Sequence, residues 1–166
     1  MTEPLPLRAA LPAEFDRIAD LCVDAYSTGG HLREDDPYTE VLRNVAARAQ
    51  AGQVLVHERD GRIAGTVTIC PPGTEFSEIG RPGEFEFRFL AVDPAHWGTG
   101  VGPGIVETCD QLAREGGDAA IVICVISINT QARRMYERLG FERLPERDWS
   151  PNPQVDLLAY RRPVHY

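Results

Sequence analysis

A glycine-rich segment in the middle of the chain constrains the fold most strongly. Trp97-Gly-Thr-Gly-Val-Gly102 follows an alternating segment, 84–89, and precedes a helical pattern that begins near Ile105. Glycine has no Cβ, so such a segment can turn tightly and bring its backbone close to an anion. The N–H groups and the positive dipole end of the following helix favour the same kind of ligand. The segment therefore predicts a diphosphate site between a strand and a helix.

Two common nucleotide fingerprints do not fit this segment. A Walker loop ends in Gly-Lys followed by Ser or Thr, whereas this segment ends in Val101-Gly102-Pro103 and so lacks both the lysine and the hydroxyl. The dinucleotide fingerprint is Gly-x-Gly-x-x-Gly, whereas Gly98, Gly100 and Gly102 are evenly spaced. We therefore expect another class of phosphate-binding protein.

A second segment provides an independent motif. It reads Asn129-Thr-Gln-Ala-Arg-Arg-Met-Tyr136-Glu-Arg-Leu-Gly140-Phe141, and it resembles the Asn-x-x-Ala-x-x-Leu/Phe-Tyr-x-x-x-Gly-Phe segment of the GNAT family of N-acetyltransferases. The segment from Trp97 resembles the same family's Gln/Arg-x-x-Gly-x-Gly/Ala loop, with Trp97 where the family usually has Gln or Arg. The resemblance extends over nearly the whole chain. It implies an acetyl-CoA-dependent N-acetyltransferase, a transferase that binds coenzyme A.

The remaining composition is consistent with one domain, 1–166. Hydrophobic residues make up 43% and charged residues 25% of the chain, as in globular proteins. We find neither a stretch of about 20 apolar residues, which a membrane helix needs, nor the start of a signal peptide, so we expect a cytoplasmic protein with no membrane partner. The net charge of −8 disfavours nucleic acid as a partner. The cysteines have no Cys-x-x-Cys spacing, so we expect buried thiols and no metal.

The periodicity predicts an α/β fold. The resemblance implies the acyl-CoA N-acyltransferase (GNAT) fold, a mixed, mostly antiparallel sheet of about seven strands flanked by about four helices and splayed between the fourth and fifth strands. We expect strands at 5–9, 53–59, 62–70, 84–89, 119–126, 141–144 and 155–160, with Asp60-Gly61 as a hairpin turn and Trp149 to Pro153 as a turn region. We expect helices from Pro12 to about Tyr26, from Asp36 to Gly52, before Gly116 and before Gly140.

The segment from Glu84 to Val92 is expected to position the chemistry. Phe85, Phe87 and Phe89 share one face of a strand, and Glu84, Glu86 and Arg88 share the other. Leu90-Ala-Val92 breaks the alternation, which predicts a β-bulge. In the resembled family a bulge here opens a gap that receives the pantetheine arm.

The resemblance also implies the residues that bind the co-substrate. Backbone groups of the bulge are expected to hold the pantetheine arm and the thioester oxygen, and the glycine-rich loop is expected to hold the diphosphate. Asn129 is expected to contact a pantetheine carbonyl, although an asparagine before a helix is also an ordinary N-cap. The predicted cofactor-binding residues are Leu90, Ala91, Val92, Trp97, Gly98, Thr99, Gly100, Val101, Gly102 and Asn129.

Two residues are predicted to be catalytic. Glu86 lies where the family often has a general base that acts through water; alternatively it is a solvated carboxylate paired with Arg88, and Glu84 is the reserve candidate. Tyr136 is predicted to be the general acid, since a phenol with a pKa of about 10 stays protonated at neutral pH. The alternative is that Tyr136 is an ordinary core aromatic residue.

The predicted reaction is transfer of an acetyl group from acetyl-CoA to a primary amine by direct attack in a ternary complex, because neither motif contains a cysteine that could carry the acyl group. The amine acceptor, a small molecule or a peptide, is expected near four residues: His31, Asp35, Tyr38 and Arg88. A non-catalytic acyl-CoA-binding module and an enzyme for longer acyl groups are the alternatives, and a homodimer stays open.

Overall fold

The computed structural model describes residues 2–166. Contacts divide the chain into two units. The first unit contains the chain up to Ile69 together with Phe89–Cys109, and the second contains Cys70–Arg88 together with Asp110–Tyr166. Strand β4 contributes its beginning to the second unit and its end to the first.

The fold is α/β, and its strands form one mixed sheet. Within residues 2–166 it has eight strands rather than the predicted seven, in the order β1-β2-β3-β4-β5-β8-β6, with β7 paired to β8. β4 and β5 are parallel and pair only at their beginnings, from Glu84 to Glu86 with Ala120 to Val122. The strands are β1 (Arg8–Ala9), β2 (Gln53–Arg59), β3 (Arg62–Ile69), β4 (Glu84–Val92), β5 (Ala120–Ile126), β6 (Glu142–Arg143), β7 (Trp149–Asn152) and β8 (Val155–Pro163).

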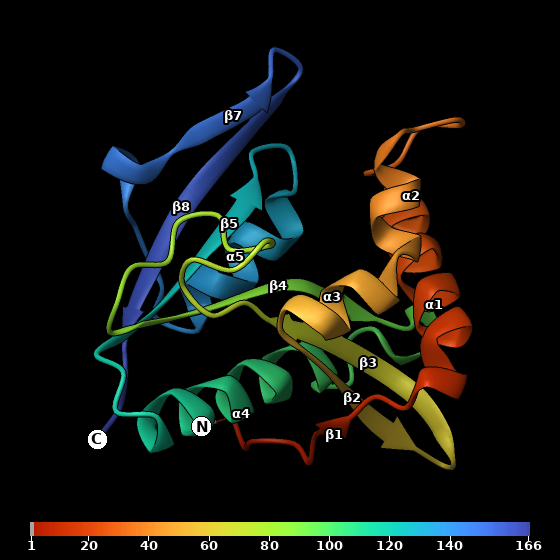
Figure 1. Ribbon diagram of the computed structural model, residues 1–166, viewed down its shortest axis with the longest axis horizontal. Helices are drawn as coiled ribbons and strands as arrows, with labels where there is room; N and C mark the ends of the chain where they lie inside the picture. The colour runs from red at the N-terminus through yellow and green to blue at the C-terminus, as the bar shows by residue number, and fades with distance from the viewer. Residues whose placement is uncertain (1) are drawn as a thin grey trace. The chain divides into compact units, whose positions relative to one another are not determined.

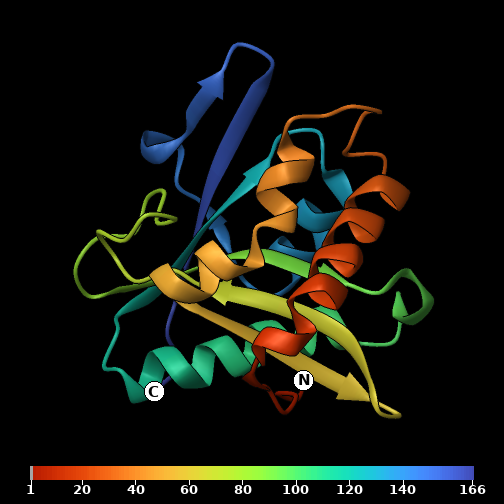
Figure 2. The same cartoon turned by 45° about the vertical axis from the view of Figure 1, so that its right-hand side comes forward.

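The first unit is built around the β2–β3 hairpin (Figure 1). Asp60 and Gly61, with φ of 52° and 74°, form the predicted tight turn. Helix α1 (Phe15–Thr28) follows a short 3-10 helix, η1 (Pro12–Glu14), and buries the predicted apolar face that includes Ile18 and Leu21. In Figures 1 and 2, α1 lies beside the two short helices that follow it.

The prediction of one helix from Asp36 to Gly52 is wrong. The structure has two helices, α2 (Tyr38–Arg43) and α3 (Val45–Ala51). Asn44 separates them with φ and ψ of −85° and 63°, and its side chain accepts a hydrogen bond from the Ala47 amide. Asparagine favours such caps because its short side chain competes for backbone N–H groups.

Helix α4 (Val101–Glu115) packs closely on β3. A Cβ on Gly65 would lie 2.8 Å from Ile105 Cδ1 and 2.9 Å from Val101 Cγ1, so this helix needs a glycine on the strand that it covers. The Leu5 amide donates to the Gly104 carbonyl, and Thr108 Oγ1 donates to the Leu5 carbonyl. These contacts fix the beginning of α4, where the predicted diphosphate loop ends.

The second unit is centred on β5, which is nearly fully buried and pairs with β8 over its whole length. Helix α5 (Thr130–Arg138) ends before Gly140, whose φ is 90°, as predicted. The prediction of a turn region from Trp149 is wrong, because β7 pairs there with β8 to form a hairpin (Figure 1). Pro151 and the polar residues of this exposed edge strand conceal its β-periodicity.

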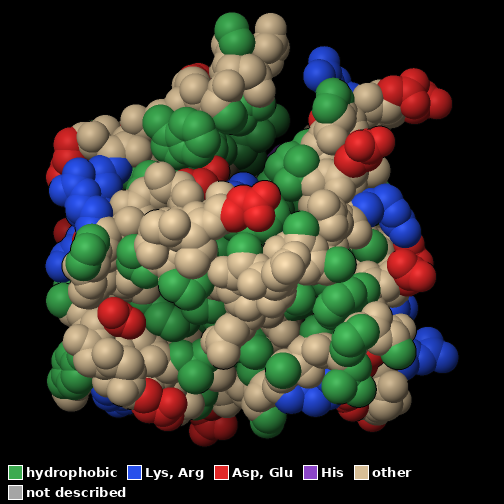
Figure 3. Space-filling model, in the orientation of Figure 1, with side chains coloured by type: hydrophobic (Ala, Val, Ile, Leu, Met, Phe, Trp, Pro, Cys, Tyr) green, Lys and Arg blue, Asp and Glu red, His purple; other side chains and the backbone are tan. Residues whose placement is uncertain are grey.

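Two further observations concern the surface. No helix among the described residues is long and apolar enough to cross a membrane. Acidic and basic side chains are interspersed over the face seen in Figure 3. Charge alone therefore marks no site on this face.

Candidate active site

The glycine-rich loop lies in the first unit between β4 and α4. β4 ends at Val92, and a 3-10 helix, η2 (Pro94–His96), follows. Gly98 and Gly100 have φ of 75° and 87°, in the left-handed region that L-residues with a Cβ avoid. Val101 then begins α4. The sequence correctly predicted a strand, a glycine turn and a helix in this order.

Side-chain hydrogen bonds fix the shape of the loop. Trp97 Nε1 donates to the Val92 carbonyl at 2.8 Å, although 37% of the residue's surface is exposed. Thr99 Oγ1 donates to the His96 carbonyl at 2.5 Å and accepts from Arg59 Nη1 at 3.0 Å. The side chains of the loop are therefore used to hold its backbone.

The loop keeps backbone donors available. The Thr99 amide donates to the His96 carbonyl, whereas the amides of Gly98 and Gly100 have no acceptor within the part of the chain that the structure describes. A Cβ built on either glycine would meet no atom within 4 Å, so the space in front of both is open. The amides of Val101 and Gly102 belong to the first turn of α4, whose N–H groups have no partner within the helix. The loop can therefore accept an anion such as a diphosphate.

β4 departs from regular geometry at Phe89. Its φ of 57° is rare for a bulky residue and costs about 1–3 kcal/mol. The Phe89 ring stacks with Tyr38 at a centroid distance of 6.4 Å, and the Arg48 guanidinium carbon lies 4.3 Å from the ring centroid. The irregularity lies one residue before the predicted bulge segment, in which Ala91 is buried and Leu90 and Val92 are half-buried.

Helix α5 positions two predicted residues. Asn129 is its N-cap, and Asn129 Oδ1 accepts from the Ala132 amide at 3.0 Å. The backbone amide of Asn129 donates to the Ile126 carbonyl, whereas its side-chain nitrogen, Nδ2, has no acceptor among residues 2–166, so capping leaves a side-chain donor available. Tyr136 is buried, with its ring centroid 6.2 Å from that of Phe87 and 5.4 Å from that of Phe141. Tyr136 thus has the environment of a core aromatic residue and also contacts the predicted key strand.

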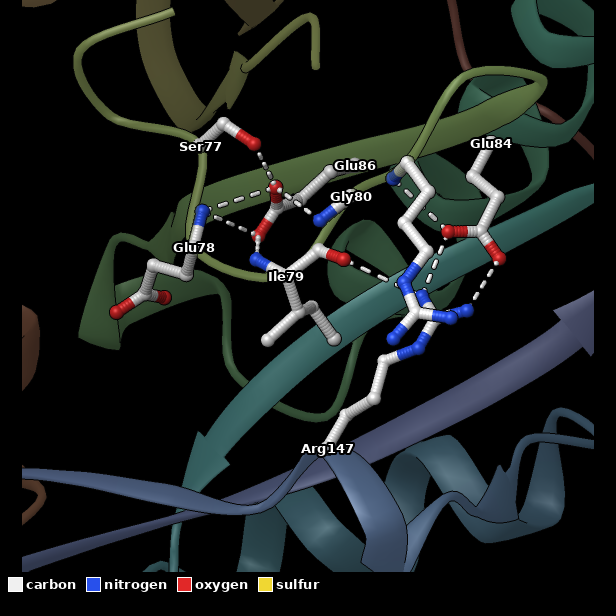
Figure 4. Close-up of polar contacts among 8 residues, drawn as sticks. Ser77, Glu78, Ile79, Gly80, Glu84, Glu86 and Arg147 are labelled. Atoms are coloured by element: carbon white, nitrogen blue, oxygen red, sulfur yellow. Dashed lines mark hydrogen bonds and ion pairs between the residues drawn. The ribbon is translucent and has the colours of Figure 1, made fainter. Parts of the chain in front are cut away.

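Glu86 is buried and holds a loop. Its side chain lies beneath the segment 77–80, and only 1% of the residue is exposed. Its carboxylate accepts hydrogen bonds from Ser77 Oγ at 2.8 Å and from the amides of Glu78, Ile79 and Gly80 at 3.0–3.2 Å (Figure 4). The alternative prediction, a solvated carboxylate paired with Arg88, is therefore wrong. The oxygens of Glu86 are instead occupied by donors of the segment 77–80.

Glu84, the reserve candidate, is also engaged. Arg147 Nη1 and Nη2 donate to its two carboxylate oxygens at 2.6 and 3.1 Å, and the Arg81 amide donates at 2.9 Å (Figure 4). Burial alone would raise the pKa of Glu84, but the hydrogen bonds from Arg147 and Arg81 outweigh it and lower the pKa below its ordinary value. A carboxylate with a lowered pKa is a weak base.

A third carboxylate, Glu78, was not predicted. Glu78 Oε1 lies 2.9 Å from Arg88 Nε. Burial raises the pKa of Glu78 to about 7, with Arg88 lowering it and the Glu86 carboxylate raising it further. Glu78 lies in an irregular loop whose residues have no periodicity, so no sequence signal predicts where its side chain points.

The predicted acceptor residues are separated. Tyr38 begins α2 and stacks on Phe89, and Arg88 pairs with Glu78. Asp35 is exposed in the turn before α2 with φ of 61°, and the Tyr38 amide at the start of that helix donates to the side chain of the neighbouring Asp36. His31 is half-buried, and its Nδ1 has no hydrogen-bond partner within residues 2–166. Tyr38 therefore contacts β4, and Arg88 contacts the segment 77–80 that covers Glu86.

Comparison with known proteins identifies the class. A profile of the acetyltransferase (GNAT) family matches residues 15–141, which include both predicted motifs. The fold and this match define the protein as an acyltransferase. The chain belongs to the GNAT family of acetyltransferases.

Individual relatives are distant. The chain is 26% identical over 145 residues to N-alpha-acetyltransferase RimI of Mycobacterium tuberculosis. The alignment covers 86% of this chain and 82% of that protein. It is 26% identical over 170 residues to N-alpha-acetyltransferase 40 of Saccharomyces cerevisiae. That alignment covers 89% of this chain but only 58% of the yeast protein. The chain thus spans less than two thirds of the yeast relative.

Solved structures share the fold. An acetyltransferase of the GNAT family from Staphylococcus aureus matches with a TM-score of 0.75 and 14% identity, over 96% of this chain and 99% of the other. The Salmonella typhimurium protein yncA, whose structure contains its cofactor acetyl-CoA, matches with a TM-score of 0.64 and 21% identity, over 99% of this chain and 96% of the other. At these identities the likeness is one of fold.

Proposed function

We propose that the protein transfers an acetyl group from acetyl-CoA to a primary amine by direct attack within a ternary complex. The observation that carries the proposal is the pair of unengaged amides of Gly98 and Gly100 at the beginning of α4, in a chain of the GNAT family. Backbone donors in this arrangement suit a diphosphate such as that of coenzyme A. The acetyl-CoA named with a structure of the same fold supports the choice of co-substrate.

The chain's own groups then divide the binding between them. The amides of Gly98, Gly100, Val101 and Gly102 hold the diphosphate, with Trp97 and Thr99 shaping the loop. Backbone groups of Leu90 to Val92 and the side-chain nitrogen of Asn129 hold the pantetheine arm. The N–H groups near Ala91 and Val92 stabilise the oxyanion that forms on the thioester carbonyl, which typically contributes about 3 kcal/mol in acyl transfer. When bound, acetyl-CoA supplies an activated acetyl group.

Two proton transfers complete the reaction. Tyr136 donates a proton to the departing thiolate, for which a phenol is well suited at neutral pH. A carboxylate takes a proton from the attacking ammonium group. Glu86 remains the sequence-based prediction for this second role.

The acceptor is a primary amine of a small molecule or a peptide. The names of the two N-alpha-acetyltransferase relatives favour a peptide with a free N-terminus as the first acceptor to test. His31, Asp35, Tyr38 and Arg88 remain proposed acceptor contacts. A cytoplasmic location and a homodimer also stay predictions.

Steady-state release of free CoA from acetyl-CoA tests the proposal. The panel contains a peptide with a free N-terminal alanine, the same peptide already acetylated, spermidine and glycine. We expect saturable release with at least one free amine and none with the acetylated peptide. Binding of acetyl-CoA without amine-stimulated release would instead support a non-catalytic acyl-CoA-binding module, and turnover only with longer acyl-CoAs would support the other alternative.

Tyr136→Phe tests the acid in the same assay. We expect a fall in kcat of about 100-fold, since general acid catalysis typically contributes at least this factor. Tyr166→Phe is the matched control, because Tyr166 is 78% exposed near the end of the chain. Equal kcat in both variants would contradict the role of Tyr136.

A further inference from the structure

Three glutamates lie on or beside the polar face of β4, and their surroundings differ. Glu84 is held by two hydrogen bonds from Arg147 and one from the Arg81 amide. Glu86 accepts five hydrogen bonds from segment 77–80. A carboxylate such as Glu86, whose lone pairs already face donors, has no free position from which to take a proton from a substrate. Glu84 is a weak base because its hydrogen bonds from Arg147 and Arg81 lower its pKa. Neither of the two predicted bases therefore suits the proton-accepting role.

Glu78 has that geometry. Its backbone amide donates to Glu86, but its side chain points away from the Glu86 carboxylate (Figure 4). Within residues 2–166, Arg88 is the only partner of the Glu78 carboxylate, through Oε1 at 2.9 Å. The other oxygen, Oε2, is left for a water molecule or a substrate proton.

Glu78 is largely but not fully covered. The side chains of Glu78 and Arg88 are 11% and 17% exposed. Arg88 Nη1 also donates to the Phe76 carbonyl at 3.0 Å, so the same arginine ties the loop to β4 at two points. A carboxylate held in this way keeps its position while solvent and a small group can still reach it.

We propose that Glu78 is the general base that accepts a proton from the ammonium group of the acceptor. This assignment rests on the acetyl transfer proposed above and replaces Glu86 in the proton-accepting role. Glu86 then acts as a positioning residue, because its hydrogen bonds to the amides of residues 78–80 set the backbone from which the Glu78 side chain projects.

The proton balance is complete with Glu78 and Tyr136. The ammonium nitrogen carries three protons and the amide product keeps one. Glu78 takes the first proton, which frees the lone pair that attacks the acetyl carbon, and later releases this proton to water. Tyr136 gives its proton to the sulfur as the carbon–sulfur bond breaks; the nitrogen then releases its second proton to water, and water returns a proton to the phenol.

The two groups lie on opposite faces of β4. Arg88, which pairs with Glu78, has the same parity along the strand as Glu86, whereas Phe87, which contacts Tyr136, faces the other way. The proton acceptor and the proton donor can thus serve different atoms, the nitrogen and the sulfur.

Two charged groups act on Glu78. Burial is the largest influence and raises its pKa to about 7, with Arg88 lowering it and the Glu86 carboxylate raising it further. Cys124 on β5 is a further titratable group near these residues, and burial raises the pKa of its thiol to about 12, with Glu78 and Glu86 adding to the rise. The thiol is therefore neutral at neutral pH and does not compete as a base. A base with a pKa near the working pH is the most effective kind.

The test compares Glu78→Gln with Glu75→Gln, the same change at an exposed glutamate of the same loop. The measured quantity is kcat/KM against pH from 5 to 9, with one acceptor from the amine panel used throughout so that its own ionisation contributes equally. Wild type and Glu75→Gln should lose activity below pH 7, because a protonated carboxylate cannot act as a base. In Glu78→Gln, kcat/KM at pH 7.5 should fall about 100-fold or more. The decline of kcat/KM below pH 7, which we call the acidic limb, should be absent from this variant. Thermal unfolding and acetyl-CoA titration check that each variant is folded.

A second variant acts on the base without removing it. Arg88→Gln removes the charge that lowers the pKa of Glu78, so the acidic limb should move to higher pH; an unmoved limb would overturn the assignment. A Glu78→Gln profile equal to wild type would also overturn it, while wild-type turnover would leave the acetyltransferase function intact. No turnover of any amine by wild type would overturn both.

Discussion

Alanine at Gly98 separates the binding role of the loop from its role in folding. Gly98 has φ of 75°, and a Cβ there would meet no atom of the chain within 4 Å. The substitution therefore adds backbone strain but no collision. Gly117, in the turn after α4, has the same φ and equally open surroundings, so Gly117→Ala is a matched control.

The strain should be equal in the two variants. Left-handed backbone costs a residue with a Cβ about 1–2 kcal/mol. For a chain of this size that corresponds to a fall in Tm of about 2–8 °C. Both variants should therefore unfold at similar temperatures, slightly below wild type.

Coenzyme A binding should differ between them. In Gly98→Ala the added methyl group projects into open space at the loop and strains its left-handed backbone, which should weaken the contact of the loop amides with a phosphate. Loss of one hydrogen bond to a charged group costs about 1.5–3 kcal/mol, which is roughly 10- to 100-fold in Kd.

Isothermal titration calorimetry with coenzyme A measures this difference. We expect wild-type affinity for Gly117→Ala and the stated loss for Gly98→Ala. Equal affinities would refute the argument that the glycine-rich loop holds the diphosphate.

Three further predictions concern the surrounding structure. Glu86→Gln should lower the free energy of unfolding by about 1.5–3 kcal/mol, because an amide nitrogen would face backbone donors; an unaltered urea midpoint would argue against the anchoring role. Asp110→Asn should cost about 3–5 kcal/mol, since Asp110 and Arg162 form a buried ion pair at 3.1 Å, and calorimetry showing no change in Tm would contradict this. Hydrogen bonds from Arg8 and the Leu11 amide lower the pKa of Glu14 to about 2. Its contribution to stability should be complete above the unfolded-state pKa of about 4.3 and disappear as the pH falls through 2, so a wild-type advantage over Glu14→Gln that persists unchanged at pH 2 would be inconsistent.

Local sequence signals predicted the parts of the fold that local physics determines. The Asp60-Gly61 turn needs positive φ at both positions, and few residue pairs allow this. The turn at Gly98 and Gly100 was predicted for the same reason. Such positions are readable because the backbone conformation itself selects the residue type.

Predictions failed where long-range contacts or caps outweigh periodicity. The apolar spacing from Val41 to Ala49 continues through Asn44, yet the asparagine side chain ends one helix and caps the next. The strand that begins at Trp149 exists because β8 pairs with it, and its own composition resembles a turn.

The proposed catalytic carboxylate shows the same limit. Alternation along β4 correctly places Glu84, Glu86 and Arg88 on one face, but it does not say what covers that face. The covering segment is an irregular loop, and its backbone amides occupy Glu86 while Glu78 faces Arg88. Strand periodicity therefore predicts the location of the polar cluster, and the packing of the loop determines which carboxylate can accept a proton.

Direct detection of the product tests the central claim most directly. The protein is incubated with acetyl-CoA labelled in the acetyl group and with the free-amine panel, and the amines are analysed by mass spectrometry. We predict that label appears on the nitrogen of one acceptor in equal amount to the CoA released, and that the protein itself carries none. Label on the protein, or CoA release without a labelled amine, would contradict direct transfer to an amine.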